Sequence, residues 1–82
     1  MLEPAKIKEF LDYVNRLNNA LDLVGFNGKF IPGTLYPRVG FVIGPSAAQI
    51  VRHLHLSQKL KSYYEVRRTK RTKPSYAIEI ED

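Results

Sequence analysis

The sequence predicts a single small α+β domain, with elements in the order helix, two strands, helix or helix pair, two strands. Three observations lead to this fold class. Apolar residues recur at helical spacing in residues 1–25 and 46–63, residues 26–45 and 64–82 divide into short extended runs between turn formers, and 82 residues provide only one core. We expect an antiparallel or mixed sheet with the helices on one face.

The N-terminal segment, residues 1–25, predicts an amphipathic helix of about five turns. Pro4 is suited to the first turn, and Gly25 to the end of the helix. The apolar positions follow the three-and-four spacing of one helical face: Ile7, Phe10, Leu11, Val14, Leu17, Ala20, Leu21 and Val24.

Residues 26–45 predict a hairpin, because Asn27-Gly28, Pro32-Gly33 and Gly44-Pro45 separate two extended runs. The second run covers 35–43. One face of it is firmly apolar, with Val39, Phe41 and Ile43, whereas the other carries Arg38, Gly40 and Val42. This alternation is typical of a sheet covered by helices on one side.

Residues 46–63 predict a helix that starts at Ser46, which forms a capping-box pattern with Gln49. The apolar phase slips after Leu54, so we expect one kinked helix or two helices with a break near His55. A helix pair followed by a basic hairpin would be a winged-helix arrangement, with residues 57–64 as recognition helix and 67–73 as wing. In that sequence-specific variant Gln58, Lys59 or Ser62 would reach base edges.

Residues 64–82 predict a basic C-terminal hairpin, with two strands joined around residues 69–74. Tyr76, Ile78 and Ile80 share one face of the closing strand, while Ala77, Glu79 and Glu81 share the other. The basic residues therefore lie at the exposed end of the hairpin.

The net charge of +5 comes from thirteen Lys and Arg against eight Asp and Glu, and it is unevenly placed. Residues 46–82 carry eight of the thirteen cations. Such a stripe binds a polyanion through several phosphates at once, so we expect a DNA-binding module, with duplex DNA as the partner. The alternative is a protein-interaction or oligomerisation module with an acidic partner. The candidate DNA-binding residues are Arg67, Arg68, Lys70, Arg71 and Lys73, with Arg52, Lys59 and Lys61 as a second line.

Catalytic patterns are missing from the sequence. It has no cysteine and no phosphate-binding loop, and His53 and His55 lack the further ligands of a metal site. We therefore expect no enzyme activity, no cofactor and no metal. No apolar stretch is long enough to span a membrane and no signal pattern is present, which favours a cytoplasmic protein. So small a core also suggests a homo-oligomer.

The order of short motifs resembles the alpha domain that precedes the motor in FtsK/SpoIIIE-type DNA translocases. The motifs are LDLVGFNGK at 21–29, LYPRVGF at 35–41, IVRHL at 50–54, Leu60, Val66-Arg67 and YAIEI at 76–80. Tyr36 departs from the family glycine, residues 68–73 replace a proline-glycine turn, and the ATPase motor is missing. The resemblance implies a ring around duplex DNA, beside a motor or another protein partner.

The resemblance also assigns core positions to this chain. It implies a strand core of Pro37, Val39 and Phe41, a helix core of Ile50, Leu54 and Leu60, and a closing strand with Ile78 and Ile80. Residues 68–73 have no counterpart in the family pattern, so we expect them to be this chain's own means of holding phosphates.

Overall fold

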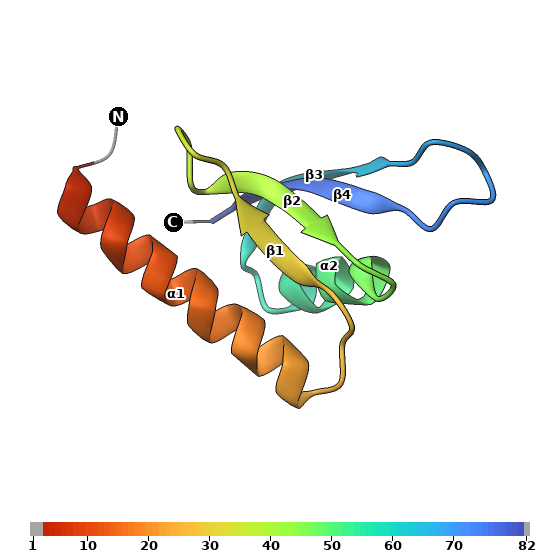
Figure 1. Cartoon of the computed structure of the whole chain (residues 1–82), viewed down its shortest axis with the longest axis horizontal. Coiled ribbons are helices and arrows are strands. Elements are labelled where there is room, and N and C mark those ends of the chain that lie inside the picture. The colour runs from red at the N-terminus through yellow and green to blue at the C-terminus, as the bar shows by residue number, and fades with distance from the viewer. Residues whose placement is uncertain (1–2, 82) are drawn as a thin grey trace.

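The computed structural model describes residues 3–81 and confirms the α+β fold in the order α-β-β-α-β-β. The elements are α1 (Pro4–Leu23), β1 (Lys29–Pro32), β2 (Val39–Ile43), α2 (Ala47–Leu56), β3 (Leu60–Val66) and β4 (Ser75–Ile80). The strands form one antiparallel sheet in the order β1-β2-β4-β3 (Figure 1). No helix of residues 3–81 is both long enough and apolar enough to cross a membrane.

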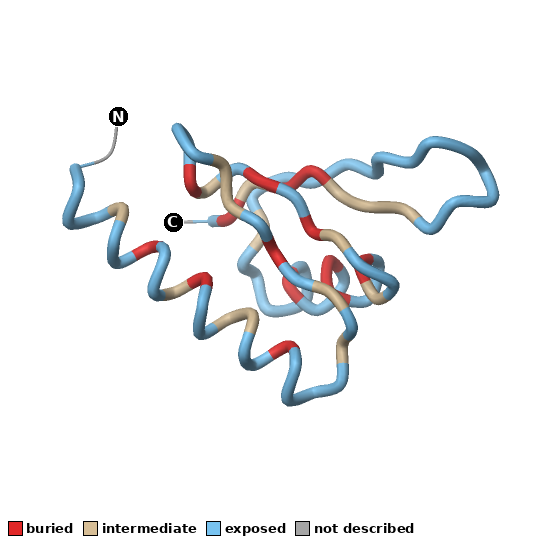
Figure 2. Tube along the Cα trace, viewed as in Figure 1, coloured by how far each residue is buried: buried red, intermediate tan, exposed pale blue. Residues whose placement is uncertain are grey.

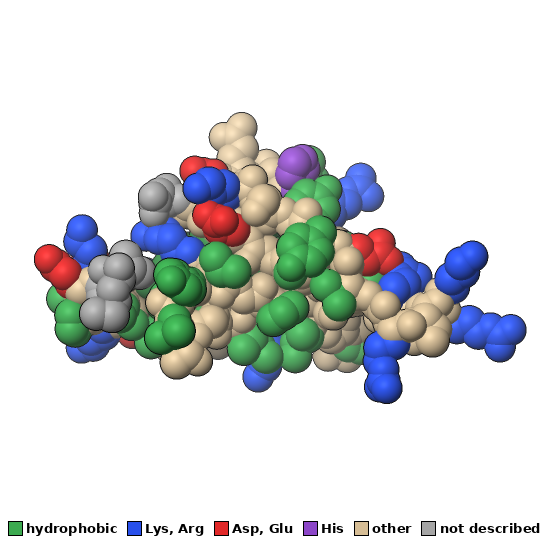
Figure 3. Space-filling view, turned by 90° about the horizontal axis from the view of Figure 1, so that it is seen from above, with side chains coloured by type: hydrophobic (Ala, Val, Ile, Leu, Met, Phe, Trp, Pro, Cys, Tyr) green, Lys and Arg blue, Asp and Glu red, His purple; other side chains and the backbone are tan. Residues whose placement is uncertain are grey.

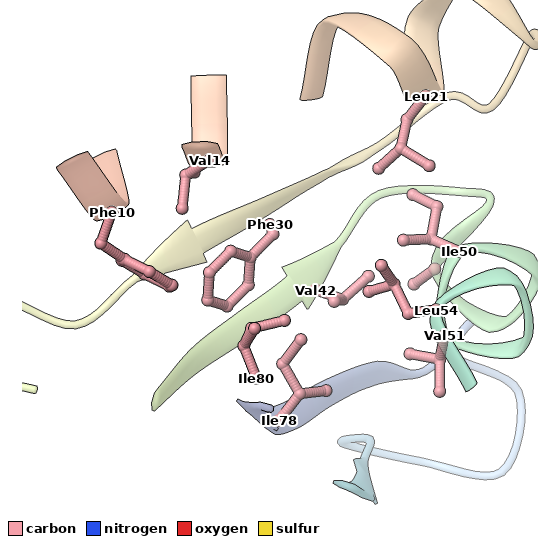
Figure 4. Close-up of a cluster of buried hydrophobic side chains, with 11 residues drawn as sticks. Phe10, Val14, Leu21, Phe30, Val42, Ile50, Val51, Leu54, Ile78 and Ile80 are labelled. Atoms are coloured by element: carbon pink, nitrogen blue, oxygen red, sulfur yellow. The ribbon is translucent and has the colours of Figure 1, made fainter. Parts of the chain in front are cut away.

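Helix α1 lies within the predicted range, residues 1–25, of which 1 and 2 lie outside the described residues. Pro4 occupies its first turn, and Gly25 follows it with a φ of +84°, a conformation that glycine adopts without steric cost. Phe10, Val14 and Leu21 point from its apolar face into the core (Figure 4). These residues are spaced so that they lie on one side of the helix, which therefore packs along the sheet.

The side chain of Asn18 joins α1 to the outer edge of β1. Its amide nitrogen donates a hydrogen bond to the Phe30 carbonyl (3.0 Å), and its amide oxygen accepts one from the Phe30 N–H (2.9 Å). Both backbone groups of Phe30 face away from β2 and would otherwise lack a strand partner. This part-buried asparagine therefore closes an edge of the sheet.

One sheet face, which we call the covered face, packs under both helices. Figure 2 shows its buried positions in the middle of the fold, and Figure 4 shows Phe30, Val42, Ile78 and Ile80 in one cluster, with Val42 beside Leu54 of α2. The pairing register brings Phe30 beside Val42, and Ile78 beside Gly40. Apolar side chains of three strands thus meet on this face, and among the described residues no polar side chain is buried with them.

The expected orientation of β2 is wrong. Val39 and Phe41, which the family resemblance places in the core, point away from the helices and remain 45% and 50% exposed. Val42 and Gly40 face the helices instead. The reason lies in the neighbouring strands, because the register aligns Val42 with Phe30, and those strands determine which side is covered. The second strand also begins at Val39 rather than at residue 35.

The helix expected over 57–63 is also wrong. Helix α2 ends at Leu56, Gln58 takes a left-handed φ of 58°, and the Lys59 N–H donates to the Leu54 carbonyl. The chain then enters β3, in which Leu60 pairs with Ile80 as a strand residue rather than as helix core. No recognition helix exists at 57–64, so the winged-helix arrangement does not form. The basic hairpin starts at Leu60 instead of residue 64.

Ser46 lies at the N-terminus of α2, as the capping-box pattern predicts, but its hydroxyl has a different partner. The structure gives no side-chain cap from Ser46 to the helix. Its hydroxyl oxygen instead accepts a hydrogen bond from the Asn27 N–H at 3.0 Å. Ser46 therefore connects the start of α2 to the segment before β1.

Candidate nucleic-acid interface

Residues 67–74, which we call the basic loop, join β3 to β4 at one end of the molecule. Figure 1 shows this hairpin extending beyond the helices, along the longest axis of the fold, which measures 41 Å. Strand β3 is exposed along its length except at Leu60, so neither helix covers the outer part of the hairpin. The basic loop is thereby open to a large partner.

Hydrogen bonds within the basic loop shape its turn. The Thr72 N–H donates to the Thr69 carbonyl (3.2 Å), and the two threonine hydroxyls lie 2.8 Å apart. At the base of the loop, the Ser75 hydroxyl donates to the Val66 carbonyl (3.3 Å). No role was predicted for these hydroxyl residues, although clustered Thr and Ser between two strands are a recognised turn signal.

The cations of the basic loop are gathered at this end of the molecule, on the right of Figure 3, where several Lys and Arg side chains project. All of them are exposed, and the loop itself contains no acid: Arg67, Arg68, Lys70, Arg71 and Lys73. Arg67 forms an ion pair with Glu65 and donates a hydrogen bond to the Lys70 carbonyl at 3.2 Å. The other four cations have no acidic partner among the residues that the structure describes.

The predicted second line of cations lies apart from the basic loop. Lys59 and Lys61 flank the start of β3, about 20 Å along that strand from the loop. Lys61 forms an ion pair with Glu79 at 3.2 Å, and Arg52 is an exposed residue of α2. The structure therefore brings together five of the eight candidate residues, and it does not place the other three beside them.

A second charged region, a hollow of about 440 Å³, lies between α1 and the end of β4. Lys6 and Arg38 line it together with Glu9. The Arg38 guanidinium lies 5.1 Å from the centroid of the Phe10 ring and donates to the Glu81 carbonyl. Burial raises the pKa of the Tyr13 hydroxyl, and the charge of Arg38 partly offsets this. Because cations and carboxylates are mixed here, the hollow does not favour a polyanion.

The two histidines have different surroundings. The His53 ring lies against Phe26 and the His55 ring against Tyr63, each with 5.9 Å between ring centroids. Within residues 3–81, no group of three potential metal-ligating side chains comes together. Both histidines therefore contribute aromatic packing.

Comparisons with known proteins add no relative. No family model matches the chain, and no curated protein or solved structure matches it either. The resemblance to the alpha domain of DNA translocases stays a prediction that depends on the short motifs alone.

Proposed function

We propose that this protein is a DNA-binding module that holds duplex DNA by its phosphates through the basic loop. One observation carries the proposal: five exposed cations occupy a single projecting loop, and Glu65 is the acid beside them. Each cation that reaches a phosphate releases condensed counterions, which favours binding to any sequence.

The shape of the hairpin supports a duplex as the partner. The major groove of B-DNA is about 12 Å wide and admits a two-stranded ribbon. β3 and β4 form such a ribbon, and its end is free of helices (Figure 1). On this proposal the hairpin enters or crosses a groove, and cations on both sides of the loop reach the phosphates that border it.

The side-chain contacts of the basic loop favour phosphate contacts over base readout. Arg67 is held near the ribbon by Glu65 and by the Lys70 carbonyl, whereas Arg68 and Arg71 have no ion pair or hydrogen bond to a described residue and can follow the backbone of a polyanion. If four or five cations contact phosphates, the logarithm of the binding constant falls with the logarithm of salt concentration with a slope of about −4. Affinity then changes little between sequences of the same length.

The experiment is a fluorescence-anisotropy titration of labelled duplex at several salt concentrations. The test variant is Arg68→Ala/Arg71→Ala, and the matched control is Lys8→Ala/Arg16→Ala, which removes two exposed cations of α1. Both double variants lower the net charge equally. We expect the test variant alone to lose affinity on every duplex and to reduce the salt slope by about 2.

Two outcomes would overturn the proposal. The first is a duplex affinity that falls equally in both double variants, because it would show that total charge matters and the basic loop does not. The second is no binding by the native chain at low salt. Binding of an acidic protein that DNA does not displace would then favour the protein-interaction alternative.

A further inference from the structure

The sheet face that points away from the helices is apolar, and we call it the open face. It carries Ile31, Val39 and Phe41 on the strands β1 and β2, and Tyr64 and Val66 on β3. A hollow of about 570 Å³ lies on this face between Ile31, Val39, Phe41 and Tyr64. Leu35 and Tyr36, from the loop between β1 and β2, also line it. Tyr64 is 68% exposed and Phe41 is 50% exposed. A monomeric domain seldom leaves so many adjacent apolar side chains in water.

The size of the open face is that of a stable protein interface. An aromatic side chain presents about 150–250 Å² when fully exposed, and the exposed parts of these seven residues amount to roughly 800 Å². A standard-size interface buries about 800 Å² on each partner. One copy of the open face therefore supplies the whole of one side, so two copies match each other in area and in apolar character.

The charges of the chain are placed so that two copies can approach through this face. The chain as a whole carries +5, but the basic loop holds most of that charge at the end of the hairpin. The only acid of the open face among the described residues, Glu79, forms an ion pair with Lys61. Lys29 lies at the margin, where β1 begins. Self-association through the open face therefore brings few like charges together.

We propose that the open face is the interface of a homodimer, in which the sheets of two copies pack face to face. Stacked sheets lie about 10 Å apart, which lets side chains such as Phe41 and Tyr64 interdigitate between them. The sheet edge is a poorer interface, because β3 carries a bulge between Leu60 and Ser62 and charged side chains such as Lys61. The dimer is independent of the proposed DNA binding and is measured without DNA.

The test is sedimentation velocity of the full chain over about a hundredfold range of concentration, with Phe41→Glu as the variant. We expect the native chain to reach twice the 9.4 kDa mass of one copy. We expect Phe41→Glu to raise the dissociation constant at least about a hundredfold, because a carboxylate would be buried unpaired. Leu56→Glu is the control, since Leu56 is 72% exposed on α2 and lies outside the open face.

A second variant separates loss of the interface from loss of the fold. Tyr64→Glu changes a ring that is mostly in solvent within one copy, so its circular dichroism spectrum should match that of the native chain. A folded, monomeric Tyr64→Glu supports the proposal. A native chain that stays monomeric at the highest concentration would overturn it, and so would a dimer that survives both open-face variants.

Discussion

The two faces of the sheet are built from similar side chains but have opposite surroundings. On the covered face, Phe30 is 1% exposed beneath the helices, while on the open face Phe41 is 50% exposed. Within β2 itself, Phe41 points to the open face and the next residue, Val42, to the covered face, since side chains of a strand alternate between the two faces. The covered face accounts for folding, and an apolar face with no helix over it is available for a partner. Apolar character alone therefore does not identify a core.

The largest change in the free energy of unfolding should separate two alanine variants, one at a phenylalanine of each face. Phe30→Ala should lower the free energy of unfolding by about 3–5 kcal/mol, because it empties a fully packed site. Phe41→Ala should cost about 1 kcal/mol in dilute protein, where its ring is already half in water. Urea denaturation at low concentration measures both.

The same pair of variants also tests the dimer. As protein concentration rises, the cost of Phe41→Ala should grow, because dimerisation stabilises only folded chains that retain the interface. The cost of Phe30→Ala should not depend on concentration in this way. Equal costs for the two variants in dilute protein would contradict the distinction between the faces.

The next effect concerns the edge of the covered face. Asn18→Ala should lower the free energy of unfolding by about 2 kcal/mol, because the N–H and carbonyl of Phe30 both lose their partner. Asn19→Ala, at an exposed neighbouring position of α1, should change it by less than about 0.5 kcal/mol. Urea denaturation of both variants gives the difference. Similar changes at the two positions would show that the contact between Asn18 and Phe30 contributes little to stability.

Sequence alone predicted the covered face only in part. In β4, Ile78 and Ile80 alternate with Ala77 and Glu79, so Glu79 marks the more polar side of the strand. The prediction that Ile78 and Ile80 share the buried side is confirmed. In β2 both sides are largely apolar, and Val39 and Phe41 were assigned to the core. Only the pairing of Val42 with Phe30 decides the orientation, and no single strand contains that information.

The error at residues 57–63 has a different cause. Leu60 and Tyr64 have the four-residue spacing of a helix, but Tyr63, Tyr64 and Val66 are residue types that strands favour. The left-handed turn at Gln58 is invisible in a residue type that seldom adopts it. The basic loop was located correctly because Thr69, Thr72 and Pro74 are turn-forming residues between two runs of strand-favouring residues. The distance between the basic loop and Lys59 or Lys61 could not be predicted, because it depends on residues 60–66 forming the extended strand β3.

A smaller effect joins the open face to DNA binding and depends on both proposals. A dimer carries two basic loops, so a long duplex that contacts both should bind it about tenfold more tightly than one copy. Phe41→Glu should remove this gain while leaving affinity for a duplex long enough for only one loop unchanged. Anisotropy titrations with the two duplex lengths measure it. An unchanged affinity of the monomeric variant for the long duplex would show that each loop binds alone.

The smallest expected effect is on the stability of the basic loop variant, and it extends the comparison to a region outside both faces. Arg68→Ala/Arg71→Ala should change the free energy of unfolding by less than about 0.5 kcal/mol, because neither side chain has an ion pair or hydrogen bond to a described residue. Arg67→Ala should cost slightly more, since Arg67 contacts Glu65 and the Lys70 carbonyl. Urea denaturation of the three proteins checks this order. A large loss in the double variant would mean that the loop helps to hold the fold, and its lost DNA affinity would then no longer report phosphate contacts.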